Sequence, residues 1–374
     1  MDTEFSLNPP RRERTPDLRQ ALRRARAIYG TAYLDQLGEM LKLGIARNGL
    51  SPAEYCRYGL ADHARNDRAA RRSFLGSAGA ASLQQLLPMP VPDASGKLRF
   101  ERLMRAHGLP TTRTLARYGG HGPPDGVRHL ADATALGRYL REAADRRLFG
   151  KPAVAAEGRG VVATDGWEPA TDRLAIAADD AVPVVTLLRL LEPFERDGYL
   201  LQERLATHPE LALLLRGQVS TVRVLVLADD DGPRLHRIAW RIPAGGNLGD
   251  SFWCRGNLLA AVDPDTGRVW RVVDDVHPRQ RGVERHPDSG LPLHDRTLPD
   301  WTMLRATVLA AVELFPGDPL LAFDVALTED GPVLVGLERG TGDPAVLQLA
   351  HDVGLLETAL VRLVDGPRPM RRAA

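Results

Sequence analysis

The sequence predicts an α+β protein in which a helical segment precedes mixed α/β lobes. Three observations support this fold class. The chain has 374 residues, of which 44% are hydrophobic and 26% charged, and this length predicts two or three packed lobes rather than one simple core. Apolar residues recur at three- and four-residue spacing through residues 17–89, as they do in helices. Beyond Gly108, short alternating apolar runs are interspersed with helical ones, which is typical of a mixed α/β chain.

The N-terminal quarter is expected to divide into a tail and a helical region. Residues 1–16 carry three prolines among charges and bury little apolar surface, so we expect a disordered tail. Residues 17–92 are expected to be helical. Within them, Ser51 followed by Pro52 and Glu54 predicts a helix start, because serine caps an N-terminus and proline fits the first turn. A cluster of three prolines then closes the region.

The remaining elements follow from the local periodicity. Helices are expected at residues 97–107, 131–146, 183–189, 208–215, 299–314 and 344–364. Strands are expected at residues 148–152, 161–164, 199–205, 219–229, 235–242, 258–263, 268–273, 320–327 and 331–338. The last two strands form a hairpin that turns at residues 329–331. Residues 274–299 form a long loop rich in Pro and His, and loops of that length are usually functional.

Composition excludes several classes of protein. The formal net charge of +1 gives no electrostatic reason to expect nucleic acid or an anionic membrane as a partner. The two cysteines, Cys56 and Cys254, are far apart, so the sequence supports neither a disulfide framework nor a cysteine zinc site. No apolar run approaches the length of a membrane span, and the first residues lack the apolar stretch of a signal peptide. We therefore expect a cytoplasmic protein.

Lysine is rare enough to mark positions of interest. The chain has only three lysines, at 42, 97 and 151, and arginine carries nearly all of the positive charge. Lys151 ends a predicted strand and is soon followed by a loop that contains Gly158 and Gly160. An ammonium beside glycine N–H groups is suited to binding phosphate oxygens, although an ordinary surface turn explains the glycines equally. The loop matches neither a P-loop nor a dinucleotide fingerprint.

Two acidic residues on the predicted hairpin are candidates for a metal site. Asp324 lies among apolar neighbours in one strand, and Glu338 lies at the end of the other. A buried acid needs a partner, and two carboxylates across a ladder suit Mg²⁺. The alternative is a salt bridge from Asp324 to an arginine such as Arg223. Arg223 itself is flanked by valines, so it either snorkels to the rim or faces a polar cleft.

Seven segments in order resemble the ATP-grasp superfamily, most closely the sugar-transfer-associated ATP-grasp family. They are SPAEYCRYGL, GKLRFERLMRAHGLP, LFGKPAVAAEGRGV, YLLQERLATHPEL, VSTVRVLVL, HPDSGLPL with TLPDW, and LLAFDVALTEDGPVLVGLERGTGDPAVLQLA. The resemblance implies two α/β lobes whose antiparallel sheets clamp Mg·ATP. It places a pre-ATP-grasp segment and the N-terminal lobe at residues 93–205, the C-terminal lobe at 206–366, and a tail at 367–374.

The resemblance also implies roles for individual residues. Members typically activate a carboxylate as an acyl phosphate and join it to an amine or another nucleophile. Lys97 and Lys151 match lysines that contact the nucleotide phosphates, and Arg223 matches an arginine aimed at the γ-phosphate or acyl phosphate. Asp324 matches the first magnesium-binding acid. Further nucleotide contacts are implied for the lid loop with Gly158, Arg159 and Gly160, and for the hinge residues Gln202 and Glu203, which receive adenine and ribose.

The sequence departs from the family pattern at the second metal motif, which is usually Glu-x-Asn. One alignment puts Gly336 at the glutamate and Glu338 at the asparagine, which removes a ligand. A shift of two residues puts Glu338 at the glutamate and Gly340 at the asparagine. Ser251 and Asn257 also break an Asp-Asn-Phe and glycine-pair pattern on the acceptor side.

The resemblance therefore implies a ligase that uses ATP and Mg²⁺ with a small-molecule carboxylate and a nucleophile. The alternatives are a non-catalytic nucleotide-binding protein and a small-molecule kinase on the same fold. Substrate pockets are built from loops, and residues 247–257 and 274–294 are expected to contribute. Arg241, Arg255 and Arg339 are candidates for holding a carboxylate. The sequence leaves the identity of the acid and nucleophile, the pathway and the oligomeric state open.

Overall fold

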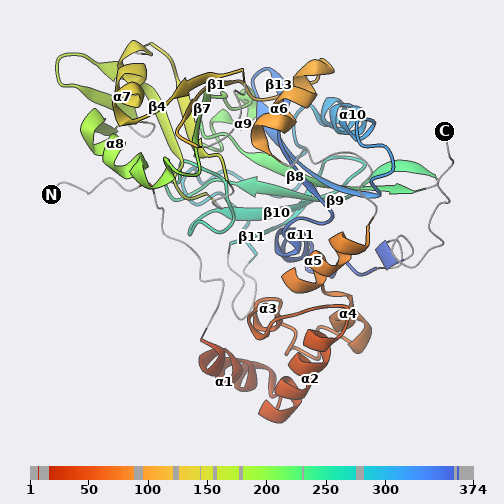
Figure 1. Cartoon of the computed structure of the whole chain (residues 1–374). Coiled ribbons are helices and arrows are strands. Elements are labelled where there is room, and N and C mark those ends of the chain that lie inside the picture. Colours follow the sequence, from red (N-terminus) through yellow and green to blue (C-terminus); the bar gives the residue numbers. More distant parts are fainter. Residues whose placement is uncertain are drawn as a thin grey trace.

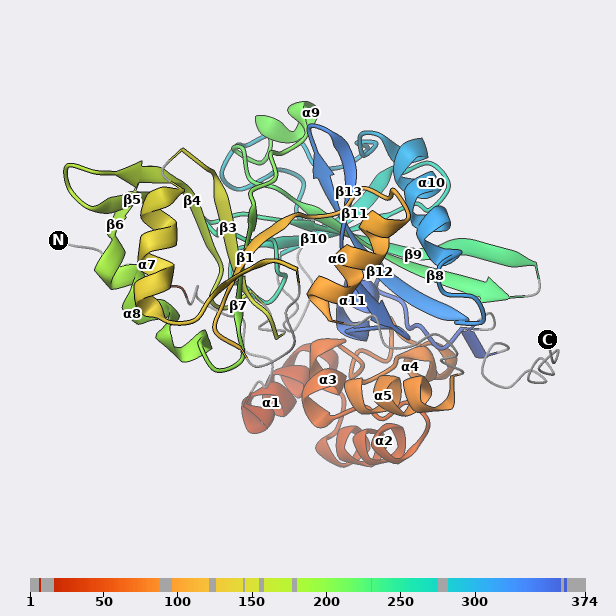
Figure 2. The same cartoon turned by 45° about the horizontal axis from the view of Figure 1, so that its top comes forward.

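The computed structural model shows a helical N-terminal part below two β-sheet lobes that lie side by side (Figures 1 and 2). It describes residues 7, 17–87, 96–120, 126–143, 145–154, 158–176, 180–229, 231–274, 282–357 and 360–361. The α+β class predicted from the sequence is confirmed. Among the described helices, none is long and apolar enough to cross a lipid bilayer.

Five helices form the N-terminal part. They are α1 (Leu18–Tyr29), α2 (Tyr33–Ile45), α3 (Pro52–Arg57), α4 (Arg68–Ser73) and α5 (Ser77–Leu86). The expected start of α3 is present, because the Ser51 side chain accepts from the Glu54 backbone and the Glu54 side chain accepts from the Ser51 backbone. This reciprocal capping satisfies two N–H groups that a helix start leaves unpaired.

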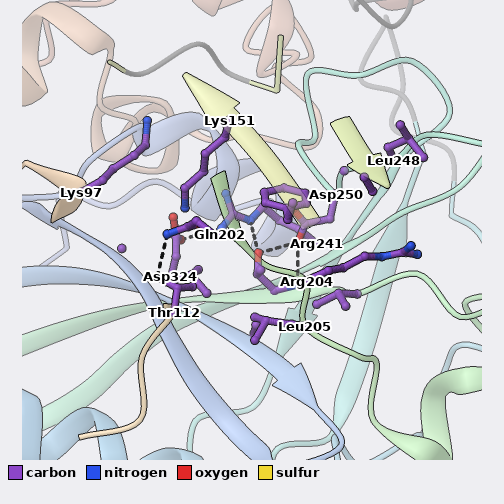
Figure 3. Close-up of a pocket in the computed structure, with 18 of the residues that line it drawn as sticks. Lys97, Thr112, Lys151, Gln202, Arg204, Leu205, Arg241, Leu248, Asp250 and Asp324 are labelled. Atoms are coloured by element: carbon purple, nitrogen blue, oxygen red, sulfur yellow. Dashed lines mark hydrogen bonds and ion pairs between the residues drawn. The ribbon is translucent and has the colours of Figure 1, made fainter. Parts of the chain in front are cut away.

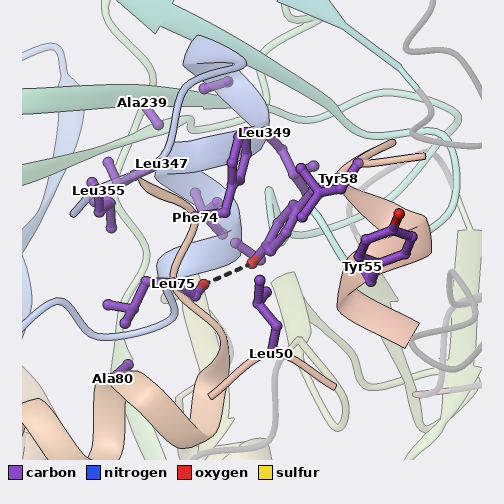
Figure 4. Close-up of a cluster of buried hydrophobic side chains, with 14 of the residues drawn as sticks. Leu50, Tyr55, Tyr58, Phe74, Leu75, Ala80, Ala239, Leu347, Leu349 and Leu355 are labelled. Atoms are coloured by element: carbon purple, nitrogen blue, oxygen red, sulfur yellow. Dashed lines mark hydrogen bonds between the residues drawn. The ribbon is translucent and has the colours of Figure 1, made fainter. Parts of the chain in front are cut away.

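The helical part is joined to the rest of the molecule through a shared apolar core. Phe74 and Leu75 pack with Leu349 from α11 (Pro344–His351), and Tyr58 donates a hydrogen bond to the carbonyl oxygen of Leu75 (Figure 4). The Gln348 side chain accepts from the Leu75 N–H at 2.7 Å and donates to the Leu75 carbonyl at 2.8 Å. The N-terminal helices therefore stabilise the second sheet from outside.

The first lobe contains a seven-stranded sheet with the order β2-β1-β7-β3-β4-β5-β6. Its strands are β1 (Thr114–Tyr118), β2 (Arg128–Leu130), β3 (Leu148–Pro152), β4 (Val162–Glu168), β5 (Arg173–Ile176), β6 (Asp180–Pro183) and β7 (Tyr199–Glu203). All neighbouring pairs are antiparallel except β1 with β2. Helices α7 (Ala133–Glu142) and α8 (Val184–Leu191), with the 3₁₀ turn η1 (Glu192–Phe194), cover it.

The second lobe contains a six-stranded antiparallel sheet with the order β11-β10-β9-β8-β12-β13. Its strands are β8 (Thr221–Asp229), β9 (Gly232–Ile242), β10 (Leu258–Val262), β11 (Val269–Val273), β12 (Leu320–Thr328) and β13 (Gly331–Arg339). One face packs on α6 (Lys97–Ala106) and α10 (Trp301–Val312), with the short α9 (Pro209–Ala212) nearby. The other face packs on α11 and the N-terminal helices. Because side chains alternate along each strand, this second face also carries the polar residues described below.

The structure corrects two expectations about secondary structure. The C-terminal helix ends at His351 rather than 364, because Asp352 adopts a left-handed conformation with φ 59°. Directly beyond it, Gly354 approaches the Ser73 backbone so closely that a Cβ atom would come within 2.1 Å. The sequence analysis also missed β1, β2, β5 and β6, which are short.

Leu7 contradicts the expectation of a tail at its position. Its side chain is 3% exposed in the core of the first lobe, and its carbonyl oxygen accepts from the Gly160 N–H at 2.9 Å. The other residues of 1–16, and the expected tail at 367–374, lie outside the described residues.

Candidate functional site

A cavity of about 370 Å³ lies between the two sheets (Figure 3). This volume falls in the range of small-molecule sites. The first lobe contributes Phe149, Lys151, Ala163, Gln202 and Glu203, and the second contributes Thr221, Arg241, Asp324, Ala326, Gly336 and Glu338. Several predicted site residues, far apart in the sequence, therefore line one space.

Two lysines provide positive charge on this cavity. Lys151 lies on β3, and Lys97 lies in the first turn of α6. The Lys97 ammonium donates to the carbonyl oxygens of Pro152 at 2.8 Å and Ala153 at 3.3 Å. Burial lowers the pKa of each lysine to about 8, and for Lys151 the neighbouring charge of Lys97 adds to the effect. Both ammonium groups are mainly protonated at neutral pH, and both are partly desolvated by burial.

Three adjacent strands of the second sheet, β8, β12 and β13, hold an arginine and the two carboxylates that pair with it. The guanidinium of Arg223 donates to both oxygens of Asp324, at 2.9 and 3.0 Å, and to both oxygens of Glu338, at 2.8 and 3.3 Å. Arg241 adds an ion pair to Asp324 at 2.7 Å. The salt-bridge alternative for Asp324 is therefore present in the ligand-free structure, and Arg223 faces the cluster rather than the rim.

The pKa values in this cluster are set by its ion pairs. Burial alone would lower the pKa of Arg223, but the facing carboxylates outweigh it, and the pKa lies well above its usual value. Burial alone would raise the pKa of Asp324, but Arg223 and Arg241 hold it well below its usual range. Arg223 and Asp324 are thus both charged at neutral pH.

Asp324 and Glu338 could hold a magnesium ion whose remaining ligands are phosphate oxygens and water. Gly336 lies directly opposite Asp324 in the β12–β13 ladder, and Glu338 follows two residues on. The Glu338 side chain is 48% exposed, so part of it is open to the cavity. Among the described residues no group of three or more acidic, His or Cys side chains is suited to a metal ion. Two carboxylates are sufficient for Mg²⁺ that arrives with nucleotide phosphates and water.

Gln202, a predicted hinge residue, is held in a buried polar network. Its amide nitrogen donates to Thr114 Oγ1 at 2.9 Å, Thr112 Oγ1 at 3.1 Å and Glu101 Oε2 at 3.2 Å. Glu203 also borders the cavity and pairs with Arg113 at 2.9 Å. Glu101 was missed by the sequence analysis, because nothing in the local pattern distinguishes it from a surface acid of an amphipathic helix.

Asp250 is another cavity residue that the sequence analysis did not single out. It lies in the loop 247–257, which was expected to line a substrate pocket, together with Leu248 and Gly249. Its carboxylate accepts from both the backbone N–H and the hydroxyl of Thr221. Burial raises its pKa, and the nearby Arg241 opposes that shift. In the sequence, only its place within the predicted pocket loop 247–257 pointed to Asp250.

The structure does not bring every predicted residue to the cavity. Arg223, Gly158 and Gly160 do not line it, and Arg159 is exposed. Gly160 has φ 70°, and a Cβ there would come within 2.4 Å of the Phe194 ring, so only glycine fits. A Cβ on Gly158 would meet Ser251 of the second lobe at 2.9 Å.

Two of the three arginines predicted to hold a substrate carboxylate also lie elsewhere. Arg255 is exposed and does not border the cavity. Arg339 points to the opposite face of the sheet from Glu338, where it forms a buried ion pair with Asp318 at 3.0 Å and lies over the Phe315 ring. Within the loop 274–294, residues 275–281 lie outside the described residues, and the rest does not border the cavity.

The solved structures that match this chain share little sequence with it. The VanG D-Ala:D-Ser ligase from Enterococcus faecalis is 10% identical, with a TM-score of 0.40 over 72% of this chain and 61% of that one. Biotin carboxylase from Campylobacter jejuni is 12% identical, with a TM-score of 0.40 over 84% and 53%. The D-alanine-D-alanine ligase from Coxiella burnetii is 8% identical, with a TM-score of 0.37 over 72% and 56%. The chain thus spans about half the length of these structures.

Sequence comparison gives a more specific result. No curated protein sequence matches the chain significantly. A family model described as sugar-transfer-associated ATP-grasp matches residues 90–362, which is well over half of the chain and begins after the N-terminal helices. Members of the ATP-grasp superfamily are typically ATP-dependent ligases that act on small molecules, and their fold typically binds ATP with Mg²⁺. The chain belongs to the sugar-transfer-associated ATP-grasp family.

Proposed function

We propose that this protein is an ATP- and Mg²⁺-dependent ligase that activates a carboxylate as an acyl phosphate and joins it to an amine or another nucleophile. The observation that supports it best is the arrangement of charge across the cavity. Lys97 and Lys151 lie on one side, and the Arg223 cluster lies on the other. Family membership supplies the reaction class.

In this proposal the lysines bind the phosphates. Lys97 and Lys151 are desolvated cations at neutral pH, so phosphate oxygens would replace the hydration that burial has removed. Gln202 and Glu203, on β7 beside the strand of Lys151, would receive the base and ribose. Residues 158–160 would cover the phosphates.

The Arg223 cluster would serve the transfer step. A substrate carboxylate oxygen forms a bond to the γ-phosphorus, and the bond from that phosphorus to the bridging oxygen breaks to release ADP. Arg223 is 3% exposed and does not itself line the cavity, but it pairs with Asp324 and Glu338, which do. In this role it would offset negative charge on the transferred group. The nucleophile then attacks the acyl carbon, phosphate leaves with the bonding electrons, and an amine nucleophile releases a proton.

Asp324 and Glu338 are the residues that would hold magnesium. Bound there, Mg²⁺ would neutralise charge on the β- and γ-phosphate oxygens. Arg241 is the one substrate-binding candidate that borders the cavity, and it is already paired with Asp324. A substrate carboxylate would compete with Asp324 for that guanidinium.

Two measurements test the proposal. Calorimetric titration with ADP and a non-hydrolysable ATP analogue should show binding that requires Mg²⁺ and that both Lys151→Ala and Glu338→Ala weaken. Leu213→Ala, at an exposed position of the second lobe, is the control. ADP release should then appear with one combination from a panel of acids and amines. Absence of binding, or no ADP with any combination, would count against a ligase.

A second candidate is a nucleotide-binding protein without turnover. The observation that favours it is Gly336, which occupies the position opposite Asp324 where a further acid would complete a metal site. Tight ADP binding without ADP release from ATP would select this function. A phosphorylated product without a new amide, ester or thioester would instead select a small-molecule kinase.

A further inference from the structure

The buried carboxylate of Glu101 organises the polar network beside the cavity. Glu101 lies on α6, one turn after Lys97, and is 4% exposed. Its oxygens accept from the Thr114 N–H at 2.7 Å, the Thr114 hydroxyl at 2.6 Å and the Thr112 hydroxyl at 3.3 Å. The Gln202 amide nitrogen lies 3.2 Å from Oε2. This one side chain therefore ties α6 to β1 and β7.

The network dictates which way the Gln202 amide faces. An ionised carboxylate only accepts hydrogen bonds, so the hydroxyls of Thr112 and Thr114 both direct their protons at Glu101. Their lone pairs are then left to accept, and Gln202 Nε2 donates to both. Three acceptors thus surround the nitrogen. A flipped amide would place its oxygen against all three, which is unfavourable.

We propose that Glu101 is a positioning residue that fixes the Gln202 amide with its oxygen presented to the ligand. Gln202 borders the cavity, and its nitrogen is committed to the network, so the oxygen is the end that remains for a base. An oxygen accepts from an exocyclic amino group and repels a carbonyl at the same place. Glu101 thereby makes the cavity select an aminopurine over an oxopurine. The inference rests on the proposed function, since it requires a nucleotide in the cavity.

The test compares ATP with inosine triphosphate, which carries a carbonyl in place of the 6-amino group. Wild-type protein should bind ATP more tightly. In Glu101→Gln the new amide both donates and accepts, so Gln202 is free to flip, and the preference for ATP should fall by about tenfold, the equivalent of one hydrogen bond. Glu101→Asp keeps an acceptor-only group and should retain the preference even if overall affinity drops.

Met104→Ala is the matched control, because Met104 is buried on the same helix in the apolar core and makes no contact in the network. It should lower the melting temperature without changing the ratio of the two affinities. If Glu101→Gln does not fold, Gln202→Met carries the test, since it removes the oxygen and should lose the same selectivity. An unchanged ratio in the variant tested, or equal wild-type affinities, overturns the inference. A wild-type protein that binds neither nucleotide refutes the proposed function instead.

A second, independent observation concerns the outer face of α2. Its inner face buries Gln36, Met40 and Leu43. Its outer face carries an apolar stripe at helical spacing, formed by Leu34 (81% exposed), Leu37 (45%), Leu41 (64%) and Ile45 (80%). Four large apolar side chains in one exposed row mark an interaction surface.

The charges beside the stripe indicate the partner. Asp35 and Lys42 are two turns apart on the same edge of the helix, and neither forms an ion pair within the described residues. When two identical helices pair antiparallel, like edges meet, so Asp35 of each copy faces Lys42 of the other. In a parallel pair this edge would meet the opposite edge of the partner helix, so Asp35 and Lys42 would not face each other. We infer that α2 pairs antiparallel with α2 of a second copy of this chain.

Sedimentation equilibrium tests this pairing. Wild-type protein should dimerise reversibly, and Leu34→Glu with Ile45→Glu should be monomeric, whereas Leu213→Glu at an exposed site on another element should not alter the mass. Asp35→Lys should weaken the dimer, and adding Lys42→Asp should restore it. A monomeric wild-type protein overturns the inference, and a double charge swap that fails to restore the dimer overturns the antiparallel arrangement.

Discussion

Replacing Lys151 by methionine should stabilise the ligand-free protein while weakening nucleotide binding. Burial lowers the pKa of Lys151 from 10.5 to about 8, which means that the folded state disfavours the charged ammonium. That shift corresponds to about 3 kcal/mol at most. Because the side chain is only half-buried and borders the cavity, solvent reduces the expected gain to about 1–2 kcal/mol. Methionine keeps the unbranched length without the charge.

Urea unfolding as a function of pH measures the effect. Between pH 8 and 10.5 the unfolded chain holds a proton that the folded chain has released, so wild-type stability gains from Lys151 as pH rises in that window. The advantage of Lys151→Met should therefore be full below pH 8 and shrink to the packing difference above pH 10.5. A variant no more stable than wild type at pH 7, or a gain that does not change with pH, would refute the reasoning.

Lys97→Met is the matched comparison, because the pKa of Lys97 is also lowered to about 8 by burial. The Lys97 ammonium donates to the carbonyl oxygens of Pro152 and Ala153, and its removal leaves both without that partner. The loss of these hydrogen bonds offsets the relief of desolvation. Lys97→Met should consequently gain less stability than Lys151→Met, or none.

Three further results are expected. Affinity for ADP, followed by calorimetry, should fall between pH 7 and 9, because Lys97 and Lys151 lose their protons near pH 8. Asp324→Asn should lower the free energy of unfolding by about 3 kcal/mol in urea melts, because it leaves two guanidinium groups underpaired. Gly336→Glu should strengthen the Mg²⁺ dependence of nucleotide binding in titrations, whereas Gly336→Ala should not. A Cβ there would meet Asp324 only at 3.9 Å, so both substitutions have room.

The parts of the site that lie on regular strands were predictable from the sequence. Asp324 and Glu338 stand out because alternation along a hairpin assigns each residue to a face, and a charge on a buried face needs a partner. The strand register then placed both beside Arg223, as the salt-bridge alternative required. Lys151 was identified by rarity, since lysine is scarce in this chain.

The parts that depend on distant contacts were not predictable. Glu101 has the local pattern of a surface acid, and it is buried only because β1 and β7 pack against its helix. The local sequence does not distinguish the three candidate arginines, Arg241, Arg255 and Arg339. Their surroundings depend on the face of the second sheet, or the loop, in which each lies. The C-terminal helix ends at the left-handed Asp352, and Gly354 beyond it lies close against Ser73, a contact that no local signal encodes.

The charge balance of the cavity bears on the altered metal motif. Arg223 and Arg241 neutralise the carboxylates of Asp324 and Glu338, so the two acids do not repel each other in the ligand-free state. Lys97, Lys151 and Arg204 then add three positive charges to the lining, and Glu203 and Asp250 add two negative ones, so the cavity keeps a small positive charge. Such a cavity suits an anion of moderate charge better than one of high charge. ATP complexed with Mg²⁺ is less negative than free ATP. We therefore expect nucleotide binding to require Mg²⁺ because of the charge of the nucleotide, and not only because carboxylates are present to hold the metal. Mg²⁺ dependence is thus expected even though position 336 carries a glycine instead of a carboxylate.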